Sequence, residues 1–284
     1  MNDFRNLLLQ TFRDFVKICE GNNLKYYAAY GTVLGAVRHN GFIPWDDDID
    51  VYMPRKDYEA LYKICNNENN NYCVCDYRDD NYYLFFPKFI NKKTTLIQNK
   101  NYRFVQGVYV DIFVLDNYIE DTADRNCIIK EYAKQYLNLA GSLNYSSMKE
   151  FLSLLSHGHL RSVWTIIKNI YRHGNYENYR SRISKLHQKI DSVVGNNRIC
   201  SYSVNPLWFE CYDKDWFGDG VRMTFEDMEV VLPIKYHEYL VGQYGEYMKY
   251  PPVNEQKPKH DYIYLNLNER LDFNVAISKV IDSK

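Results

Sequence analysis

The stretch GVYVDIFVLD, residues 107–116, constrains the fold more than any other part of this chain. An apolar run of this length, bounded by a glycine and a polar turn, predicts a core strand. Asp111 stands in its middle, between Val110 and Ile112. A carboxylate in such a position is costly unless it is paired or binds a metal. The stretch therefore predicts both a core strand and a functional site within it.

A second acidic feature lies in GFIPWDDDIDVYMPRKDY, residues 41–58, where Asp46, Asp47, Asp48 and Asp50 fall within five positions. Close carboxylates repel and raise one another's pKa, and a divalent cation would offset that repulsion. If a strand begins here, alternation places Asp48 and Asp50 on one side and Asp47 on the other. A run of aspartates is more commonly a solvated turn, and that interpretation stays open.

Asp48 and Asp50 can join Asp111 from a neighbouring strand to form a three-carboxylate cluster. Oxygen ligands of this kind suit Mg²⁺, or Mn²⁺ in its place, shared with a substrate phosphate. Asn substitution at any of the three is expected to stabilise the metal-free protein, because it relieves repulsion. An EF-hand is a poor rival, since Val51 would stand where that loop needs glycine.

A phosphate site is predicted beside this cluster. Gly31 is expected to turn the chain, and Thr32 to lie near the N-terminus of a following helix, where backbone N–H groups favour anions. Arg38 and Lys88 are the expected cations that neutralise the remaining phosphate charge. Gly-Thr before a helix is also a common cap without function, so this assignment depends on the acidic residues nearby.

The pattern along the chain indicates an α/β protein, a small mixed sheet with flanking helices, and a separate helical lobe. We predict a catalytic core at residues 1–120, a helical lobe at 121–198, and a C-terminal part at 199–284 that packs back on the core. The expected helices are residues 3–20, 32–39, 55–65, 123–140, 148–156, 160–172, 176–190 and 235–245. The expected extended segments are residues 24–30, 48–53, 72–77, 82–90, 94–98, 107–116, 217–225 and 228–233.

Composition excludes some function classes. The formal net charge is −1, so no basic surplus points to nucleic acid. We expect neither a secretory leader nor a membrane span, and seven cysteines without framework spacing favour free thiols in a cytoplasmic protein. Zinc binding by Cys65, Cys73 and Cys75 stays open, although their spacing fits no usual zinc site.

The segment YGTVLGAVRHNGFIPWDDDIDVYMPRKDYEAL, residues 30–61, resembles the LicD family of phosphocholine-type transferases, which is related to fukutin-type proteins. The similarity extends to GVYVDIFVLD and to VVLPIKYHEYLVGQYGEYMKYPP near the C-terminus. It implies a nucleotidyltransferase-like fold and metal-dependent transfer of a phospho-alcohol from a CDP-alcohol. The acceptor would be a sugar hydroxyl of a surface glycan, such as lipopolysaccharide or capsule, or of its lipid-linked precursor.

Carried over to this chain, the resemblance assigns phosphate binding to Gly31 and Thr32, and metal binding to Asp48, Asp50 and Asp111. Asp111 is also the expected general base. CDP-choline is the favoured donor, because the segments around the expected site are rich in aromatic residues. We expect peripheral contact with the inner face of the membrane.

Other roles stay open at this stage. Trp45 is expected in the core rather than over a nucleotide, and His260 on the surface rather than in the site. The helical lobe is expected to contact the acceptor, although its aromatic residues equally suit a core. Two rival functions remain, a GT-A glycosyltransferase using the aspartate motif and a non-catalytic glycan-binding protein with a vestigial site.

Overall fold

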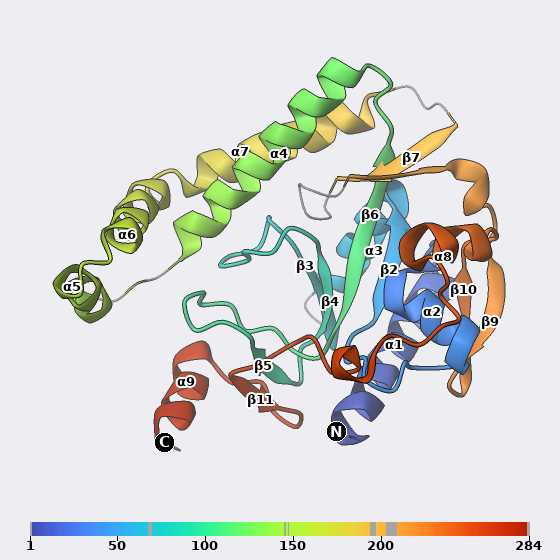
Figure 1. Cartoon of the computed structure of the whole chain (residues 1–284), viewed down its shortest axis with the longest axis horizontal. Helices are drawn as coiled ribbons and strands as arrows, with labels where there is room; N and C mark the ends of the chain where they lie inside the picture. Colours follow the sequence, from blue (N-terminus) through green and yellow to red (C-terminus); the bar gives the residue numbers. More distant parts are fainter. Residues whose placement is uncertain are drawn as a thin grey trace.

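The computed structural model describes residues 2–67, 70–144, 146, 148–193, 197–202 and 209–282, and it confirms the predicted α/β class (Figure 1). Its main sheet has the strand order β1-β2-β6-β4-β3, with β7 pairing to β6 and β8 to β7. The strands are β1 Tyr27–Ala28, β2 Asp50–Pro54, β3 Tyr72–Cys75, β4 Lys88–Asn91, β6 Tyr109–Asn117, β7 Arg198–Ser201 and β8 Glu210–Asp213. Strands β2 and β6 are parallel and the other pairs antiparallel, so the sheet is mixed, as predicted.

The apolar run predicted as a core strand becomes β6, which is buried from Tyr109 to Asp116. The two faces of the sheet differ in character. Phe89 and Val110 lie on one face, where Phe89 packs edge-on to Phe15 of α1 with ring centroids 5.4 Å apart. Side chains alternate along each strand, so Lys88 and Asp111 lie on the opposite face.

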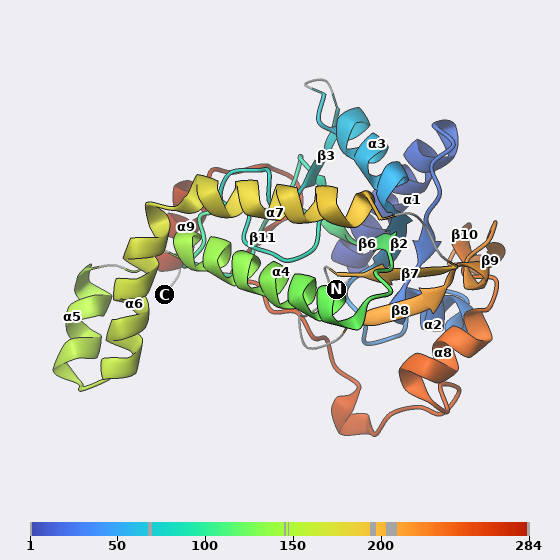
Figure 2. The same ribbon diagram turned by 90° about the horizontal axis from the view of Figure 1, so that it is seen from above.

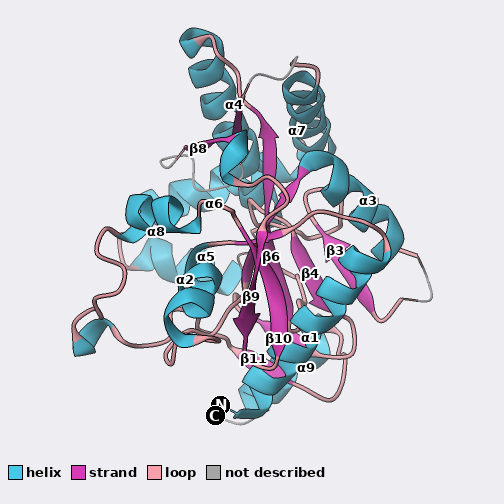
Figure 3. Ribbon diagram, turned by 90° about the vertical axis from the view of Figure 1, so that its right-hand side faces the viewer, coloured by secondary structure: helices cyan, strands magenta, loops and turns pink. Residues whose placement is uncertain are grey.

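Helices cover both faces of the sheet. Helix α1 (Asn2–Gly21) and helix α3 (Arg55–Cys65) lie on one side, whereas α2 (Tyr30–His39) and α8 (Tyr236–Tyr244) lie on the other (Figure 3). The predicted apolar stripe of α1 is its buried face and includes Leu8, Phe12, Phe15 and Cys19. The charged face is therefore enclosed between the sheet and α2, which positions the candidate site.

The four helices predicted between residues 121 and 198 all form. They are α4 Thr122–Leu143, α5 Met148–Ser156, α6 Leu160–His173 and α7 Tyr176–Asp191. Helices α4 and α7 lie side by side, and α5 and α6 project beyond them (Figure 2). Tyr132 and Tyr136 belong to the buried core of this block rather than to its surface. The division of the chain into three domains stays a prediction.

Several predicted extended segments are shorter than expected. Of residues 24–30, Tyr27–Ala28 alone is strand, and of residues 82–90 the strand part begins at Lys88. Residues 221–225 and 228–232 form a hairpin, β9 Val221–Phe225 with β10 Met228–Leu232. Strand β11 (Tyr264–Asn266), which pairs with β5 (Thr95–Ile97), and helix α9 (Phe273–Asp282) were not predicted. Short 3-10 turns occupy Lys214–Trp216 and Val253–Glu255. Among the described residues, no helix has the length and apolar character to cross a membrane.

Candidate active site

Strand register brings three charged residues into one row. Parallel pairing of β2 with β6 sets Asp50 beside Asp111, and antiparallel pairing of β4 with β6 sets Lys88 on the other side of Asp111. All three side chains are buried on the sheet face that α2 covers. A row of charges in the centre of a sheet is costly to fold, so its presence favours function.

Asp48 completes the predicted cluster from the loop before β2. One carboxylate oxygen from each of Asp48, Asp50 and Asp111 lies within 4.8 Å of the others, and we call these three residues the acidic cluster. The structure thus brings together the three residues that the sequence nominated as metal ligands. The donor set is all carboxylate oxygen and largely buried, which fits Mg²⁺ or Mn²⁺.

The electrostatics of the cluster explain why a cation would be favourable there. Burial, followed by the charges of Asp48 and Asp111, raises the pKa of Asp50 well above its usual range. Burial raises the pKa of Asp111 to about 6, although the cation of Lys88 opposes this shift. Burial and the neighbouring Asp48 raise the pKa of Asp46 to about 7. Without a cation these carboxyl groups therefore keep their protons to higher pH than free aspartates do, and a bound cation would favour their ionised forms.

Lys88 neutralises part of this charge within the protein itself. Its Nζ forms an ion pair with Asp111 and lies 3.3 Å from the ring centroid of Tyr109. Lys88 was predicted to contact a phosphate, and that role stays a prediction, because an ammonium group has three donors and can bridge two anions. The structure shows that Lys88 is paired with Asp111 within the protein.

The start of α2 differs from the prediction for Gly31, whereas Thr32 lies near the N-terminus of the helix as predicted. The helix begins at Tyr30, so Gly31 lies inside its first turn rather than before it. The hydroxyl of Thr32 is buried and accepts the backbone N–H of Asp50 at 2.9 Å. Thr32 therefore positions Asp50, and its predicted contact with phosphate stays a prediction. A Cβ atom on Gly31 would collide with the carboxylate of Asp46, so any larger residue here would have to displace that carboxylate.

The expectation that Asp47 points away from the cluster is wrong. Strand β2 begins at Asp50, so Asp47 and Asp48 lie in a loop where strand alternation does not apply. Both aspartates approach the same histidine: Nδ1 of His260 lies 2.9 Å from Oδ1 of Asp47 and 3.6 Å from Oδ2 of Asp48. The hydrogen bond with Asp47 raises the pKa of His260.

His260 was expected on the surface, and that expectation is also wrong. It lies at the site and forms a second group of three potential metal ligands with Asp47 and Asp48. A histidine following the proline-rich segment 251–259 was the available sequence signal. Among the described residues, neither group of three ligands includes a cysteine, although Sγ of Cys73 lies 3.7 Å from Sγ of Cys75.

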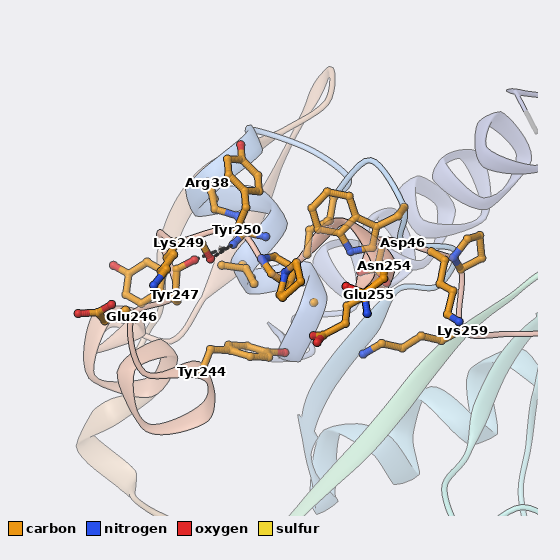
Figure 4. Close-up of a pocket in the computed structure, with 18 residues that line it drawn as sticks. Arg38, Asp46, Tyr244, Glu246, Tyr247, Lys249, Tyr250, Asn254, Glu255 and Lys259 are labelled. Atoms are coloured by element: carbon orange, nitrogen blue, oxygen red, sulfur yellow. Dashed lines mark hydrogen bonds between the residues drawn. The ribbon is translucent and has the colours of Figure 1, made fainter.

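A cavity of about 1230 Å³ opens beside the acidic cluster. Gly31 and Asp46 line it where it meets the cluster. The rest of the lining combines aromatic and apolar side chains with four cations and two further carboxylates, and it includes Arg38, Trp45, Tyr244, Glu246, Tyr247, Lys249, Tyr250, Glu255, Lys257 and Lys259. Figure 4 shows Arg38, Tyr247 and Tyr250 on one side of the cavity, and Asp46 and Lys259 on the other. Arg38 donates to the backbone carbonyl of Tyr247 at 2.7 Å. The cavity offers a ligand four cations against three carboxylates, Asp46 included, together with aromatic side chains.

Trp45 and Arg38 are both positioned to contact such a ligand. Trp45 was expected in the core, but it lines the cavity while packing partly against the core. Its ring centroid lies 6.1 Å from that of Tyr250, and the guanidinium carbon of Arg38 lies 4.8 Å from the same ring. These three side chains form one aromatic and cationic wall of the cavity.

An aromatic row follows the charged row on the same face of the sheet. Tyr52 and Phe113 are paired, two positions after Asp50 and Asp111, and the ring centroids of Phe86 and Phe113 are 4.9 Å apart. Two positions along a strand correspond to about 7 Å. We call Tyr52, Phe113 and Phe86 the aromatic row. Tyr52 and Phe113 are buried, so Phe86 is the member of this row that is partly exposed.

Glu210 of β8 lies at the end of this row, and sequence analysis did not identify it. Its Oε2 accepts hydrogen bonds from Tyr30 at 2.6 Å, Tyr52 at 2.7 Å and Tyr212 at 3.1 Å. Tyr30 is held at φ 40°, in the left-handed region, and its ring centroid lies 4.9 Å from that of Phe113. A strained residue therefore links Glu210 to the aromatic row, as is common at functional sites.

Comparison with known proteins agrees with the resemblance seen in the motifs. Residues 23–139 match the profile of the LicD/FKTN/FKRP nucleotidyltransferase domain. The chain is 28% identical over 255 residues to the lipopolysaccharide cholinephosphotransferase LicD of Haemophilus influenzae, which covers 87% of this chain and 90% of that protein. It is 35% identical over 118 residues to an uncharacterized protein of Rickettsia prowazekii, covering 40% of each chain. The predicted family resemblance is confirmed.

Proposed function

Because this chain carries the nucleotidyltransferase domain of the LicD family, we propose that it is a transferase that moves phosphocholine from CDP-choline to a sugar hydroxyl. The acceptor we propose is a lipopolysaccharide-type or capsular glycan, or its lipid-linked precursor, met at the cytoplasmic face of the membrane. The observation that carries the proposal is the buried acidic cluster next to a cavity whose lining includes aromatic side chains and four cations. A divalent cation with a nucleotide diphosphate matches this combination of charges.

The proposed donor lies with its diphosphate over the acidic cluster and its cytidine in the cavity. Asp48, Asp50 and Asp111 would hold Mg²⁺ or Mn²⁺, and His260 would orient Asp47 and Asp48 around it. The cation would polarise the phosphate oxygens. Arg38 and the lysines of the cavity would neutralise the departing CMP, and Trp45 offers a face for the base.

The proposed reaction is in-line displacement at the phosphorus that carries the alcohol. The acceptor oxygen forms a bond to phosphorus, the bond from phosphorus to the CMP oxygen breaks, and the hydroxyl proton leaves with a base. Asp111 is the candidate base, because it lies in the acidic cluster and its pKa of about 6 leaves it ionised at neutral pH. Lys88 would then stabilise whichever anion faces it.

The aromatic row favours choline over neutral alcohols. A quaternary ammonium group has no hydrogen-bond donors and is attracted to aromatic faces, whereas ribitol and glycerol need polar partners. Tyr52, Phe113 and Phe86 lie one row beyond the acidic cluster, and Glu210 adds a carboxylate at their end. With the phosphate over the cluster, the alcohol would extend toward Phe86, the partly exposed member of this row, because Tyr52 and Phe113 are buried.

A donor screen tests the proposal. The protein is incubated with Mg²⁺, a candidate glycan acceptor, and CDP-choline, CDP-ethanolamine, CDP-glycerol or CDP-ribitol, and CMP release is followed. We expect CDP-choline to have the highest kcat/KM and EDTA to abolish release. Preference for a polyol donor would contradict choline and leave the transferase proposal intact. Release of sugar from a nucleotide-sugar, or Mg²⁺ binding without turnover of any donor, would favour the rival functions.

A variant tests the contribution of Glu210 to choline recognition. Glu210→Gln keeps the shape of the side chain and removes its charge. The kcat/KM for CDP-choline should therefore fall relative to that for CDP-glycerol, by an amount equivalent to about 0.5–2 kcal/mol of activation free energy. Glu226→Gln is the matched control, because Glu226 accepts the backbone N–H of Phe42 at 3.0 Å on another part of the surface. Equal loss on both donors would show that Glu210 is structural.

A further inference from the structure

The end of the helical block farthest from the sheet has a high density of exposed apolar side chains. Helices α5 and α6 form this end, and two perpendicular views show them projecting beyond α4 and α7 (Figures 1 and 2). Seven large apolar side chains between residues 152 and 171 are exposed: Leu152, Leu155, Leu160, Trp164, Ile167, Ile170 and Tyr171. A contiguous exposed group of this kind marks an interaction surface, whereas isolated ones do not.

Helix α6 has two distinct apolar faces. Its inner face packs into the protein through the buried residues Val163 and Ile166. Its outer face is a stripe repeated at helical spacing, which we call the outer stripe: Leu160, Trp164, Ile167 and Tyr171, each 42–76% exposed. Among the described residues, nothing covers the outer stripe. An apolar face that the fold does not use is available for a partner.

The charges of α6 are all of one sign. The helix carries Arg161, Lys168 and Arg172 and contains no aspartate or glutamate. Arg161 and Lys168 are exposed and seven residues apart, so they follow one edge of the outer stripe, whereas Arg172 packs against Gly141 of α4 and donates to Asn169. Nζ of Lys168 lies 5.7 Å from the ring centroid of Trp164, which places a cation directly beside the stripe. The chain as a whole has a net charge of −1, so this excess of positive charge is local.

We infer that the outer stripe and its cationic edge form a docking surface for an anionic lipid bilayer. A helix with exposed tryptophan and aliphatic residues on one face and lysine or arginine beside them lies in the interface of such a membrane. Anionic lipid headgroups complement the cations. A second copy of this chain fits less well, because antiparallel pairing of two outer stripes across a twofold axis would bring the cationic edges together. The inference does not depend on the donor or on catalysis.

Vesicle co-sedimentation tests the inference. The full chain is mixed with vesicles of phosphatidylcholine alone, or of phosphatidylcholine and phosphatidylglycerol in equal parts, at low and high salt. We expect binding to the anionic vesicles, weakened by salt, and a blue shift of Trp164 fluorescence that Trp164→Phe removes. Arg161→Gln with Lys168→Gln should lower binding by roughly 10- to 30-fold.

Matched variants separate this surface from the rest of the molecule. Trp164→Gln with Ile167→Gln should abolish binding, whereas Val241→Gln with Val275→Gln, at 47% and 46% exposed apolar sites elsewhere, should leave it unchanged. The control for the cations is Lys17→Gln with Lys63→Gln, at exposed sites on α1 and α3.

Each outcome bears on the inference. Loss of binding in the α6 variants with normal binding in both controls would support it. It would be overturned by a wild-type protein that stays in the supernatant with anionic vesicles, or by α6 variants that bind as the wild type does. A dimer in analytical ultracentrifugation that Trp164→Gln with Ile167→Gln converts to a monomer would overturn it in favour of self-association.

Discussion

Replacing Asp50 by asparagine should stabilise the metal-free protein. The ligand atoms of the acidic cluster lie within 4.8 Å of one another. Two unit charges at that separation repel by about 3.5 kcal/mol at an effective dielectric constant of about 20. Lys88 offsets Asp111, so the repulsion between Asp48 and Asp50 is the main one relieved. Proton uptake already relieves part of it in the wild type, which leaves a gain of about 1–3 kcal/mol.

The pH dependence of stability leads independently to the same direction of change for Asp50→Asn. Burial raises the pKa of Asp50 well above its usual range, so the folded protein keeps a proton that the unfolded chain releases above about pH 4. Stability of the metal-free wild type therefore falls as pH rises from about 4 through the raised pKa values, which for Asp111 and Asp46 are about 6 and 7. Asp50→Asn should flatten this profile.

Thermal unfolding in EDTA between pH 5 and pH 8 measures the effect. A gain of about 2 kcal/mol corresponds to a rise in Tm of about 4–8 °C. Addition of Mg²⁺ should raise the Tm of the wild type and have little effect on Asp50→Asn. Asp80→Asn, at an exposed position, is the control and should change stability by less than about 0.5 kcal/mol.

Asp111→Asn should have the opposite effect, because it leaves the buried Lys88 without its partner. An uncompensated buried charge costs about 3–5 kcal/mol, and relief of repulsion returns part of that, so a net loss of about 1–3 kcal/mol is expected. The reasoning is refuted if Asp50→Asn lowers the Tm in EDTA, if both variants shift the Tm in the same direction, or if Mg²⁺ stabilises Asp50→Asn as strongly as the wild type.

The remaining predictions concern turnover and metal affinity. Gly31→Ala should lower turnover about 100-fold, because the added Cβ would displace the carboxylate of Asp46. Gly21→Ala is the control and should leave turnover unchanged, since no atom lies within 4 Å of a Cβ added there. Unchanged turnover in Gly31→Ala would contradict the close approach of Gly31 to Asp46. Arg38→Ala should lower kcat/KM for CDP-choline by an amount equivalent to about 1.5–3 kcal/mol of activation free energy, whereas the surface variant Arg222→Ala should leave it unchanged. Equal effects of the two variants would show that Arg38 does not bind the donor. His260→Asn should weaken Mg²⁺ binding about 10- to 100-fold by calorimetry, and unchanged affinity would make this contact incidental.

Local periodicity predicted most of the secondary structure. The four helices between residues 122 and 191 and the strands β6 and β10 formed close to their predicted bounds, because each contains its own apolar pattern. The segment 82–87 failed for the converse reason. Its tyrosines and phenylalanines suit a strand, but they pack as loop residues against neighbouring cores, for example Tyr82 against Phe104 with centroids 5.0 Å apart.

The sequence by itself determined which residue types would meet in the site. Asp48, Asp50 and Asp111 were nominated as a cluster because carboxylates next to apolar strands are costly without a partner, and the structure brings them within 4.8 Å. Their catalytic and metal-binding roles stay predictions, as do those of Gly31, Thr32, Arg38 and Lys88. Short-range patterns were sufficient here, since Asp48 and Asp50 lie at the start of one predicted strand and Asp111 lies within another.

Only the tertiary structure decided which partner each charged residue has. The pairing of Lys88 with Asp111, the approach of His260 to Asp47, and the position of Glu210 at the end of the aromatic row all join segments far apart in the chain. Strand register and the path of the C-terminal segment set these distances, and neither leaves a local sequence signal. For the same reason the expected effect of Asp111→Asn on stability changes from a gain to a loss, because the effect of removing a charge depends on the partner left behind.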